Sequence, residues 1–249
     1  MTPIERHGGV WVKRDDAFLF NGVRGGKVRT CLAIATAPPH PRGLVTAGSR
    51  HSPQVHIVAA VGQFLCLPVR VHVPAGADTP EVLAAVALGA GVVRHRPGYN
   101  SVIVARARGD AESSRGWRLV PFGMECSEAV EQTASQVPAT MPEGVGRVVV
   151  PVGSGMSLAG VYQGMVDRGH DQPILGVVVG ASPVSRLDAY APTWRISRRV
   201  ELVNSSLAYG RLRVGVRLGG VELDPVYEAK CIEFLQEGDL LWVVGRRTA

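Results

Sequence analysis

Residues 148–160 read Val-Val-Val-Pro-Val-Gly-Ser-Gly-Met-Ser-Leu-Ala-Gly, an apolar run followed by small residues and a helix-forming segment. This order predicts a buried β-strand, a tight turn and the start of a helix, which is typical of an α/β protein. The turn directs backbone N–H groups and the positive end of the helix to one point, which suits a phosphate group. A plain strand-to-helix turn fits equally, because neither a full GxGxxG fingerprint nor a Gly-Lys-Ser/Thr loop is present.

The same alternation of β-branched runs and alanine-rich segments continues along the chain. It predicts an α/β fold with a mainly parallel sheet arrangement. Thr79 is expected to cap a helix that has Pro80 in its first turn. The expected strands are residues 9–12, 44–46, 69–73, 91–94, 119–121, 146–152, 174–179 and 240–244, and the expected helices are residues 28–37, 53–64, 79–88, 127–136, 158–166 and 226–235.

The composition is that of a globular protein, with 249 residues, 46% hydrophobic side chains and a net charge of +6. These values exclude a disordered or low-complexity chain. No apolar run is long enough for a transmembrane helix, and the N-terminus lacks the apolar core of a signal peptide. The cysteines are widely spaced, which favours reduced thiols over disulfides or a metal site. We therefore expect a soluble cytoplasmic protein.

Lysine is rare in this chain, which has Lys13, Lys27 and Lys230 against 24 arginines. Lys27 follows two glycines at the head of a predicted helix, where desolvation favours the neutral, nucleophilic amine needed for Schiff-base chemistry. A solvated lysine after a glycine turn is the other interpretation. Because arginine cannot form an imine, a lysine kept in an arginine-rich chain favours the chemical role.

Two further segments place polar groups at predicted helix starts. Residues 47–54, Ala-Gly-Ser-Arg-His-Ser-Pro-Gln, offer hydroxyl and amide donors after a strand. Residues 223–230, Leu-Asp-Pro-Val-Tyr-Glu-Ala-Lys, put a carboxylate in a first helical turn, where the helix dipole favours it. Each segment alone is also explained as an ordinary helix start.

Taken together and in this order, the motifs resemble a known enzyme family. They are Val-Trp-Val-Lys-Arg-Asp-Asp at residues 10–16, Gly-Lys-x-Arg at 26–29, Gly-Ser-x-x-Ser at 48–52, Gly-Ser-Gly at 153–155 and Asp-Pro-Val-Tyr-Glu-x-Lys at 224–230. These motifs are similar to those of the pyridoxal-phosphate enzymes of fold type II, the tryptophan synthase β superfamily. The chain most resembles the branch of 1-aminocyclopropane-1-carboxylate (ACC) deaminase and D-cysteine desulfhydrase. The resemblance covers almost the whole chain.

This resemblance implies two open, twisted, mainly parallel sheets flanked by helices, with pyridoxal 5'-phosphate in the cleft between two domains. Residues 44–122 are expected to form the smaller domain. Residues 1–43 and 123–249 are expected to form the larger, cofactor-binding domain. Relatives are commonly homodimers, so a homodimer is expected here too.

The resemblance also implies roles for individual residues. Lys27 carries the cofactor as a Schiff base and then moves the Cα or Cβ proton of the substrate. Glu228 faces the pyridine nitrogen, and Ser52 contacts the substrate carboxylate or acts as an auxiliary base. Tyr209 and Tyr227 match the two active-site tyrosines. The phosphate is held by a turn that consists of Gly153, Ser154, Gly155, Met156 and Ser157.

The chain departs from the family pattern at several positions. Pro53 replaces an asparagine that binds the cofactor's ring hydroxyl, and Gly26 replaces the asparagine before the lysine. Residues 155–157, Gly-Met-Ser, replace Gly-Gly-Thr. The chain is also shorter between residues 99 and 116 and between residues 181 and 207. These differences are expected to remodel the substrate side more than the cofactor side.

Three functions are compatible with these features. The first is a pyridoxal-phosphate enzyme that acts through a Cα or Cβ carbanion on a small amino-acid-like substrate, by elimination with deamination or by decarboxylation. The second applies this chemistry to an amino-acid group on a nucleotide or nucleic acid, as in DNA modification. It is prompted by arginine-rich residues 94–118 and 186–217, which a GC-rich genome also explains. The third is a non-catalytic domain that binds the cofactor or another anion.

Overall fold

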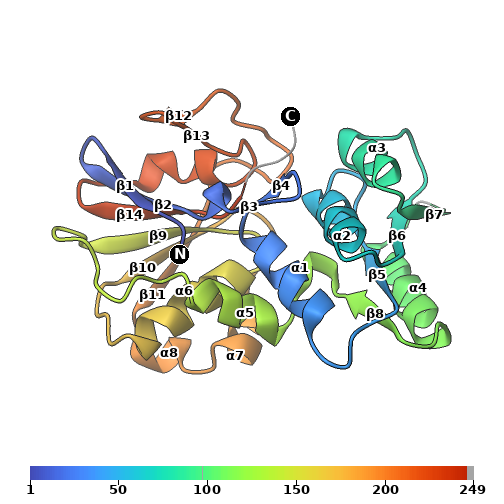
Figure 1. The fold of residues 1–249 in the computed structure, drawn as a ribbon. Helices are drawn as coiled ribbons and strands as arrows, with labels where there is room; N and C mark the ends of the chain where they lie inside the picture. The colour runs from blue at the N-terminus through green and yellow to red at the C-terminus, as the bar shows by residue number, and fades with distance from the viewer. Residues whose placement is uncertain (97, 246–249) are drawn as a thin grey trace. The chain divides into compact units, whose positions relative to one another are not determined.

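The computed structural model describes residues 1–96 and 98–245, which form two compact units (Figure 1). Unit 1 contains Met1–Phe18 and the chain from Cys126 to its described end, and unit 2 contains Leu19–Glu125. The predicted division placed residues 19–43 with the larger domain, whereas compactness groups them with unit 2. The physical reason is that the helix within this stretch packs against the next helix of unit 2.

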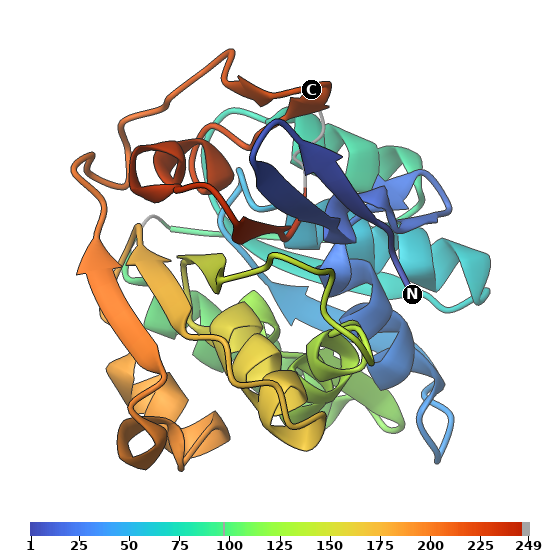
Figure 2. The same cartoon turned by 90° about the vertical axis from the view of Figure 1, so that its left-hand side faces the viewer.

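Unit 1 is built on a six-stranded sheet in which only the first two strands are antiparallel. The strand β11 lies at one edge, as Figure 2 shows in orange. In sheet order the strands are β1 (Ile4–His7), β2 (Val10–Arg14), β14 (Asp239–Val243), β9 (Arg147–Val152), β10 (Ile174–Val178) and β11 (Val200–Asn204).

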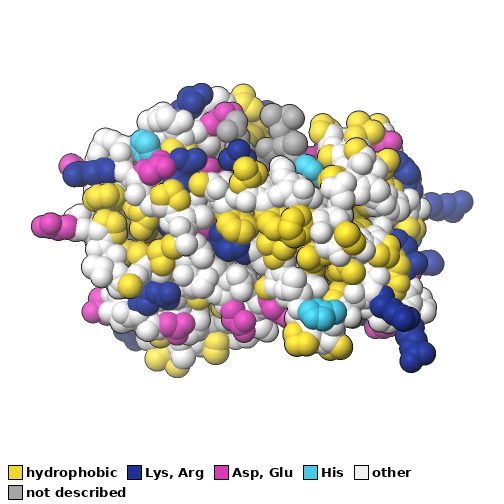
Figure 3. Space-filling model, viewed as in Figure 1, with side chains coloured by type: hydrophobic (Ala, Val, Ile, Leu, Met, Phe, Trp, Pro, Cys, Tyr) yellow, Lys and Arg dark blue, Asp and Glu magenta, His cyan; other side chains and the backbone are white. Residues whose placement is uncertain are grey.

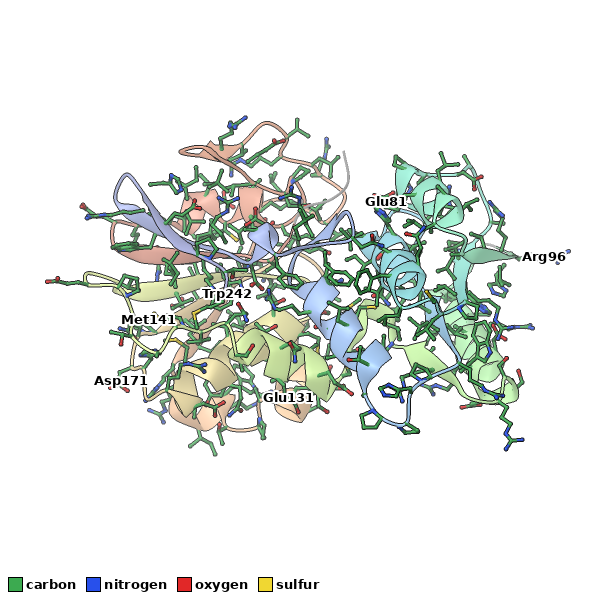
Figure 4. The ribbon with its side chains drawn as sticks, in the orientation of Figure 1. Glu81, Arg96, Glu131, Met141, Asp171 and Trp242 are labelled. Carbon is green, nitrogen blue, oxygen red and sulfur yellow. The ribbon has the colours of Figure 1, made fainter. Side chains whose placement is uncertain are left out.

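Alternating side chains of this sheet fill two cores. Along β9, Val148 and Val150 enter one core, whereas Val149 enters the other. The period of two is that of strands buried on both faces. On β14, Trp242 belongs to the first core (Figure 4). The helices that cover that core are α5 (Ser127–Ala134), α6 (Met156–Asp167), α7 (Val184–Tyr190) and α8 (Trp194–Ser197). The remaining elements of unit 1 are η1 (Asp15–Ala17), β12 (Arg217–Leu218), β13 (Val221–Glu222), η3 (Glu228–Lys230) and η4 (Ile232–Phe234).

Unit 2 has a parallel four-stranded sheet with helices on both faces. In sheet order its strands are β7 (Gly91–His95), β6 (Val69–Pro74), β5 (Gly43–Ala47) and β8 (Trp117–Val120). Val45 and Ala47 pack with α4, whereas Thr46 is directed to α2. The other elements are β3 (Leu19–Phe20), β4 (Val23–Arg24), α1 (Gly26–Thr36), α2 (Pro53–Phe64), α3 (Pro80–Ala87), α4 (Asn100–Ser113) and η2 (Phe122–Met124).

The α/β architecture confirms the predicted fold class. Thr79 caps α3 as predicted, because its hydroxyl accepts a hydrogen bond from the N–H of Val82. The helix predicted at residues 226–235 is wrong, since two short 3-10 turns occupy this segment. The pattern also did not predict α4. Within the described residues, no helix combines the length and apolar character needed to cross a membrane.

Candidate active site

The turn between β9 and α6 has the geometry of an anion-binding cradle. Gly155 has φ +97° and is the N-cap of α6, where it offers no side chain to the first N–H groups of the helix. Those N–H groups have no partner inside the helix, and the positive end of the helix dipole adds to them. A Cβ atom on Gly155 would lie 2.8 Å from Cβ of Pro183, so Pro183 borders the turn. The turn is therefore suited to a phosphate group.

Tyr227 lies against the same turn. A Cβ atom on Gly153 would be 2.8 Å from Cε1 of Tyr227 and 3.3 Å from its hydroxyl oxygen, so only glycine leaves room for the ring. The backbone before this tyrosine is held by Asp224. Its Oδ1 accepts hydrogen bonds from the N–H groups of Val226 at 2.8 Å and Tyr227 at 3.1 Å. The aspartate thus fixes the segment that brings Tyr227 to Gly153.

Glu228 follows Tyr227 and is only 1% exposed. Its Oε1 accepts a 2.8 Å hydrogen bond from the N–H of Val244, whereas its Oε2 has no hydrogen-bond partner among the described residues. Burial, with a smaller contribution from Asp224, raises the pKa of Glu228 to about 8. A buried carboxyl oxygen without a partner costs free energy, and such groups are concentrated at functional sites.

Lys230 connects this segment to the second tyrosine. It is fully buried, and its Nζ donates hydrogen bonds to the carbonyl oxygens of Ala208 at 2.8 Å and Tyr209 at 3.3 Å. The hydroxyl oxygens of Tyr209 and Tyr227 are 3.3 Å apart, and the two rings meet edge to face. Tyr209 is 52% exposed, so its side chain is accessible. Lys230 therefore helps to position Tyr209 beside Tyr227.

Lys27 occupies the first turn of α1 in unit 2. The preceding N-cap, Gly25, has φ +101°, which residues other than glycine rarely adopt. The chain consequently turns sharply before the lysine, and the N–H of Val28 donates to the carbonyl oxygen of Gly25 at 3.0 Å. Lys27 itself is half-buried. This position at a helix N-terminus is the one predicted from the sequence.

Ser52 is the N-cap of α2, the helix that follows the carboxyl end of β5. Its Oγ accepts a 3.3 Å hydrogen bond from the N–H of Gln54. The side chain of Gln54 is buried and donates to the hydroxyl of Thr46 at 2.8 Å and to the carbonyl oxygen of Pro121 at 2.7 Å. The loop that carries Ser52 is therefore anchored to the sheet, and Ser52 is left half-buried.

The structure brings the candidate residues together in two sets. Tyr209 and Tyr227 meet beside Gly153 in unit 1, and the same segment carries Glu228. Unit 1 also contains Ser154 and Ser157, which are half-buried, and Met156, which is buried. Lys27 and Ser52 belong to unit 2, at the N-terminal ends of α1 and α2, two helices that pack against each other.

The sequence pattern did not point to the positioning roles of Asp224 and Lys230, or to Pro183. A signal for Pro183 existed. Residues 180–183, Gly-Ala-Ser-Pro, follow an apolar strand in the same way as the turn after β9 does. Carboxyl ends of neighbouring parallel strands meet at one edge of a sheet, so these two turns were bound to adjoin.

Comparison with known proteins gives a consistent result. The chain matches the family model described as "Pyridoxal-phosphate dependent enzyme" over residues 2–218. Of the curated proteins, none matches it. It is similar to the solved structure of an ACC deaminase homologue, with a TM-score of 0.84 and 23% identity, over 98% of this chain and 89% of that one.

Two further solved structures share the fold at lower identity. A processed threonine deaminase isoform 2 from Solanum lycopersicum has a TM-score of 0.71 and 18% identity, over 99% of this chain and 84% of that one. Maize serine racemase has a TM-score of 0.70 and 15% identity, over 100% of this chain and 88% of that one.

Proposed function

Since the chain belongs to the pyridoxal-phosphate dependent enzyme family, we propose that it removes the amino group of a small amino-acid-like substrate by chemistry at Cα or Cβ. The similarity to an ACC deaminase homologue and to a threonine deaminase supports deamination. Among the described residues, the observation that carries the proposal is the buried, unpartnered Oε2 of Glu228, which directly follows the tyrosine that lies against the glycine turn.

The residues of unit 1 fit pyridoxal 5'-phosphate. Gly153 and Gly155 leave a turn that side chains would fill, and its helix N-terminus suits the phosphate. The Oε2 atom of Glu228 has no partner among the described residues, and the pyridine nitrogen of the cofactor would supply one. When bound, the cofactor supplies an electron sink that stabilises negative charge at the reacting substrate carbon.

The other residues have complementary roles in this proposal. Lys27 is the covalent attachment point of the cofactor and carries the proton to or from the substrate carbon. Ser52 and the N-terminus of α2 bind the substrate carboxylate, since an N-terminal helix turn favours an anion. The paired hydroxyls of Tyr209 and Tyr227 hold a proton for the leaving group or for the second carbon.

Borohydride reduction followed by peptide mass spectrometry tests the attachment point. We expect the reduced cofactor on Lys27 and on neither Lys13 nor Lys230, because both of these are fully buried. The Lys27→Ala variant should lose the absorption band of the lysine-bound cofactor, which lies at the boundary between the ultraviolet and the visible range. Attachment at another lysine, or a protein that never takes up the cofactor, would contradict the proposal.

Exchange of the substrate Cα proton for deuterium tests the role of Glu228. With D- and L-amino acids as candidates, we expect one to exchange its Cα proton and to release ammonia. In Glu228→Gln the exchange should slow roughly 100-fold while the cofactor stays attached. The matched control Glu237→Gln changes an exposed carboxylate of the same unit and should behave as the wild type. Equal rates in all three proteins would remove Glu228 from the mechanism.

A further inference from the structure

A cavity that is widely open to solvent, with a volume of about 520 Å³, lies on unit 2, at the opposite end of strand β5 from Ser52. It is placed where β5 and β8 begin, and these two strands pair at Gly43 and Trp117. Ser52, in contrast, follows the carboxyl end of β5. The N–H of Arg42 donates to the carbonyl oxygen of Gly116 at 2.7 Å, which ties together the two loops that form the cavity.

Basic side chains line this cavity, namely Arg42, Arg115, Arg118 and His40. Elsewhere in unit 2, Arg70 and Arg94 are paired with Asp110 and Asp78. By contrast, Arg42 and Arg115 are exposed and form no side-chain hydrogen bond or ion pair within the part of the chain that the structure describes. Figure 3 shows dark-blue Lys and Arg side chains along the margin of unit 2, so this unit presents basic groups to solvent.

Arg118 is held rigidly in the cavity wall. Its guanidinium donates to the carbonyl oxygens of Ile34 at 2.6 Å, Ala37 at 2.8 Å and Pro39 at 2.6 Å, at the end of α1 and just after it. None of these acceptors is a carboxylate, so Arg118 keeps its net positive charge. The charge is fixed in place, which lowers the entropy cost of using it to attract an anion.

Trp117 forms a second rigid part of the wall. A Cβ atom on Gly43 would lie 2.7 Å from its ring, and the guanidinium of Arg70 lies 3.8 Å from the ring centre. The indole is therefore held between strand β5 and a stacked arginine. The aliphatic part of the Arg42 side chain packs against Gly116, where an added Cβ atom would lie 3.0 Å from Cδ of Arg42.

We propose that this cavity binds a small molecule that carries two or more linked phosphate groups. Guanidinium groups bind phosphate oxygens in a bidentate manner, and several uncompensated arginines favour a ligand of high charge density. The cavity is open to solvent, and its volume of about 520 Å³ leaves room for more than one phosphate group. Inorganic pyrophosphate and a nucleoside triphosphate share this chemistry.

Titration with pyrophosphate and with ATP, on protein saturated with pyridoxal phosphate, tests the site by calorimetry. We expect saturable binding that weakens roughly tenfold or more in the Arg42→Gln/Arg115→Gln double variant. The matched control Arg106→Gln/Arg108→Gln removes the same charge from exposed positions of α4 and should bind as the wild type. Tighter binding of ATP indicates a nucleotide ligand, and equal affinity indicates that the linked phosphates alone are recognised.

The indole N–H resonances give a local readout. The chain has four tryptophans, of which Trp117 belongs to unit 2 and Trp11, Trp194 and Trp242 belong to unit 1. Binding at the cavity should shift the resonance of Trp117, assigned with Trp117→Phe, and leave the other three unchanged. The proposal is overturned by absent saturable binding, by equal weakening in both double variants, or by shifts confined to the tryptophans of unit 1.

Discussion

Lys13 on β2 is fully buried and donates a hydrogen bond to the carbonyl oxygen of Thr2. Its Nζ also lies 5.8 Å from the ring centre of Trp242, close enough for a cation–π interaction. Lys230 is buried in the same way against backbone carbonyls. Contacts of this kind satisfy the buried ammonium groups at both positions. For Lys27, in contrast, we propose covalent chemistry.

The buried carboxyl group of Glu228 should make the stability of the cofactor-free protein depend on pH. Its pKa is raised by burial from 4.5 to about 8 in the folded chain, whereas the unfolded chain ionises near the ordinary value. Between these values the folded protein binds more protons, so the free energy of unfolding falls as pH rises. From about pH 5 to about pH 8 the loss due to this group should be roughly 2–4 kcal/mol.

Urea unfolding of the wild type and Glu228→Gln at both pH values measures this loss. Glutamine does not ionise, so the variant should lack this part of the pH dependence. Glu237→Gln is again the matched control, and it should keep the wild-type profile. If the profiles of the wild type and Glu228→Gln run parallel, the buried carboxyl group ionises normally and the electrostatic account is wrong.

Substitution of glycine by alanine should have opposite effects on stability at two helical positions. On α6, a Cβ atom at Gly160 would lie 2.4 Å from Cβ of Thr133 and 2.9 Å from the carbonyl oxygen of Val130, both on α5. Gly160→Ala should therefore destabilise the protein by about 1–3 kcal/mol. Gly109 of α4 has nothing within 4 Å of that position, so Gly109→Ala should stabilise by about 0.5–1 kcal/mol. Urea unfolding distinguishes them, and a Gly160→Ala variant as stable as the wild type would show that α5 and α6 do not pack this closely.

The elements differ in how well their sequences predict them. Apolar strands followed by small residues are recognisable because burial on both faces requires continuous apolar runs. In contrast, α4 buries Ile103 and two alanines among many polar residues, so its apolar stripe is faint. The segment after Asp224 has a helical pattern, but Tyr227 has φ −112° and ψ −82°. The side chain of Asp224 holds it there through bonds that propensity does not reveal.

For the site residues too, the sequence predicts local positions but not contacts between distant segments. The position of the turn after β9 follows from local sequence, and so does the place of Lys27 at the start of α1. The contact of Tyr227 with Gly153 joins distant segments and depends on the packing of unit 1. The unpartnered oxygen of Glu228 likewise follows from burial in the folded unit. The roles of these residues in catalysis stay predictions.

At the scale of the whole chain, the two units differ in continuity. Unit 2 is one continuous segment, whereas the sheet of unit 1 combines the first strands with the last one. In that sheet, β14 lies between β2 and β9, and all five of its residues are buried. Unit 1 therefore cannot complete its core until the end of the chain is available, while unit 2 contains all its own strands.

A chain that ends at Gly238 lacks β14 and tests this difference. We expect limited proteolysis to degrade residues 126–238 rapidly, because the gap between β2 and β9 leaves apolar side chains and strand edges uncovered. A fragment close to residues 19–125 should persist, since its sheet and helices are intact. A chain that ends at Gly245 retains β14 and is the matched control, with both units expected to resist digestion. Simultaneous loss of both units in the shorter chain would show that unit 2 depends on unit 1 for its stability.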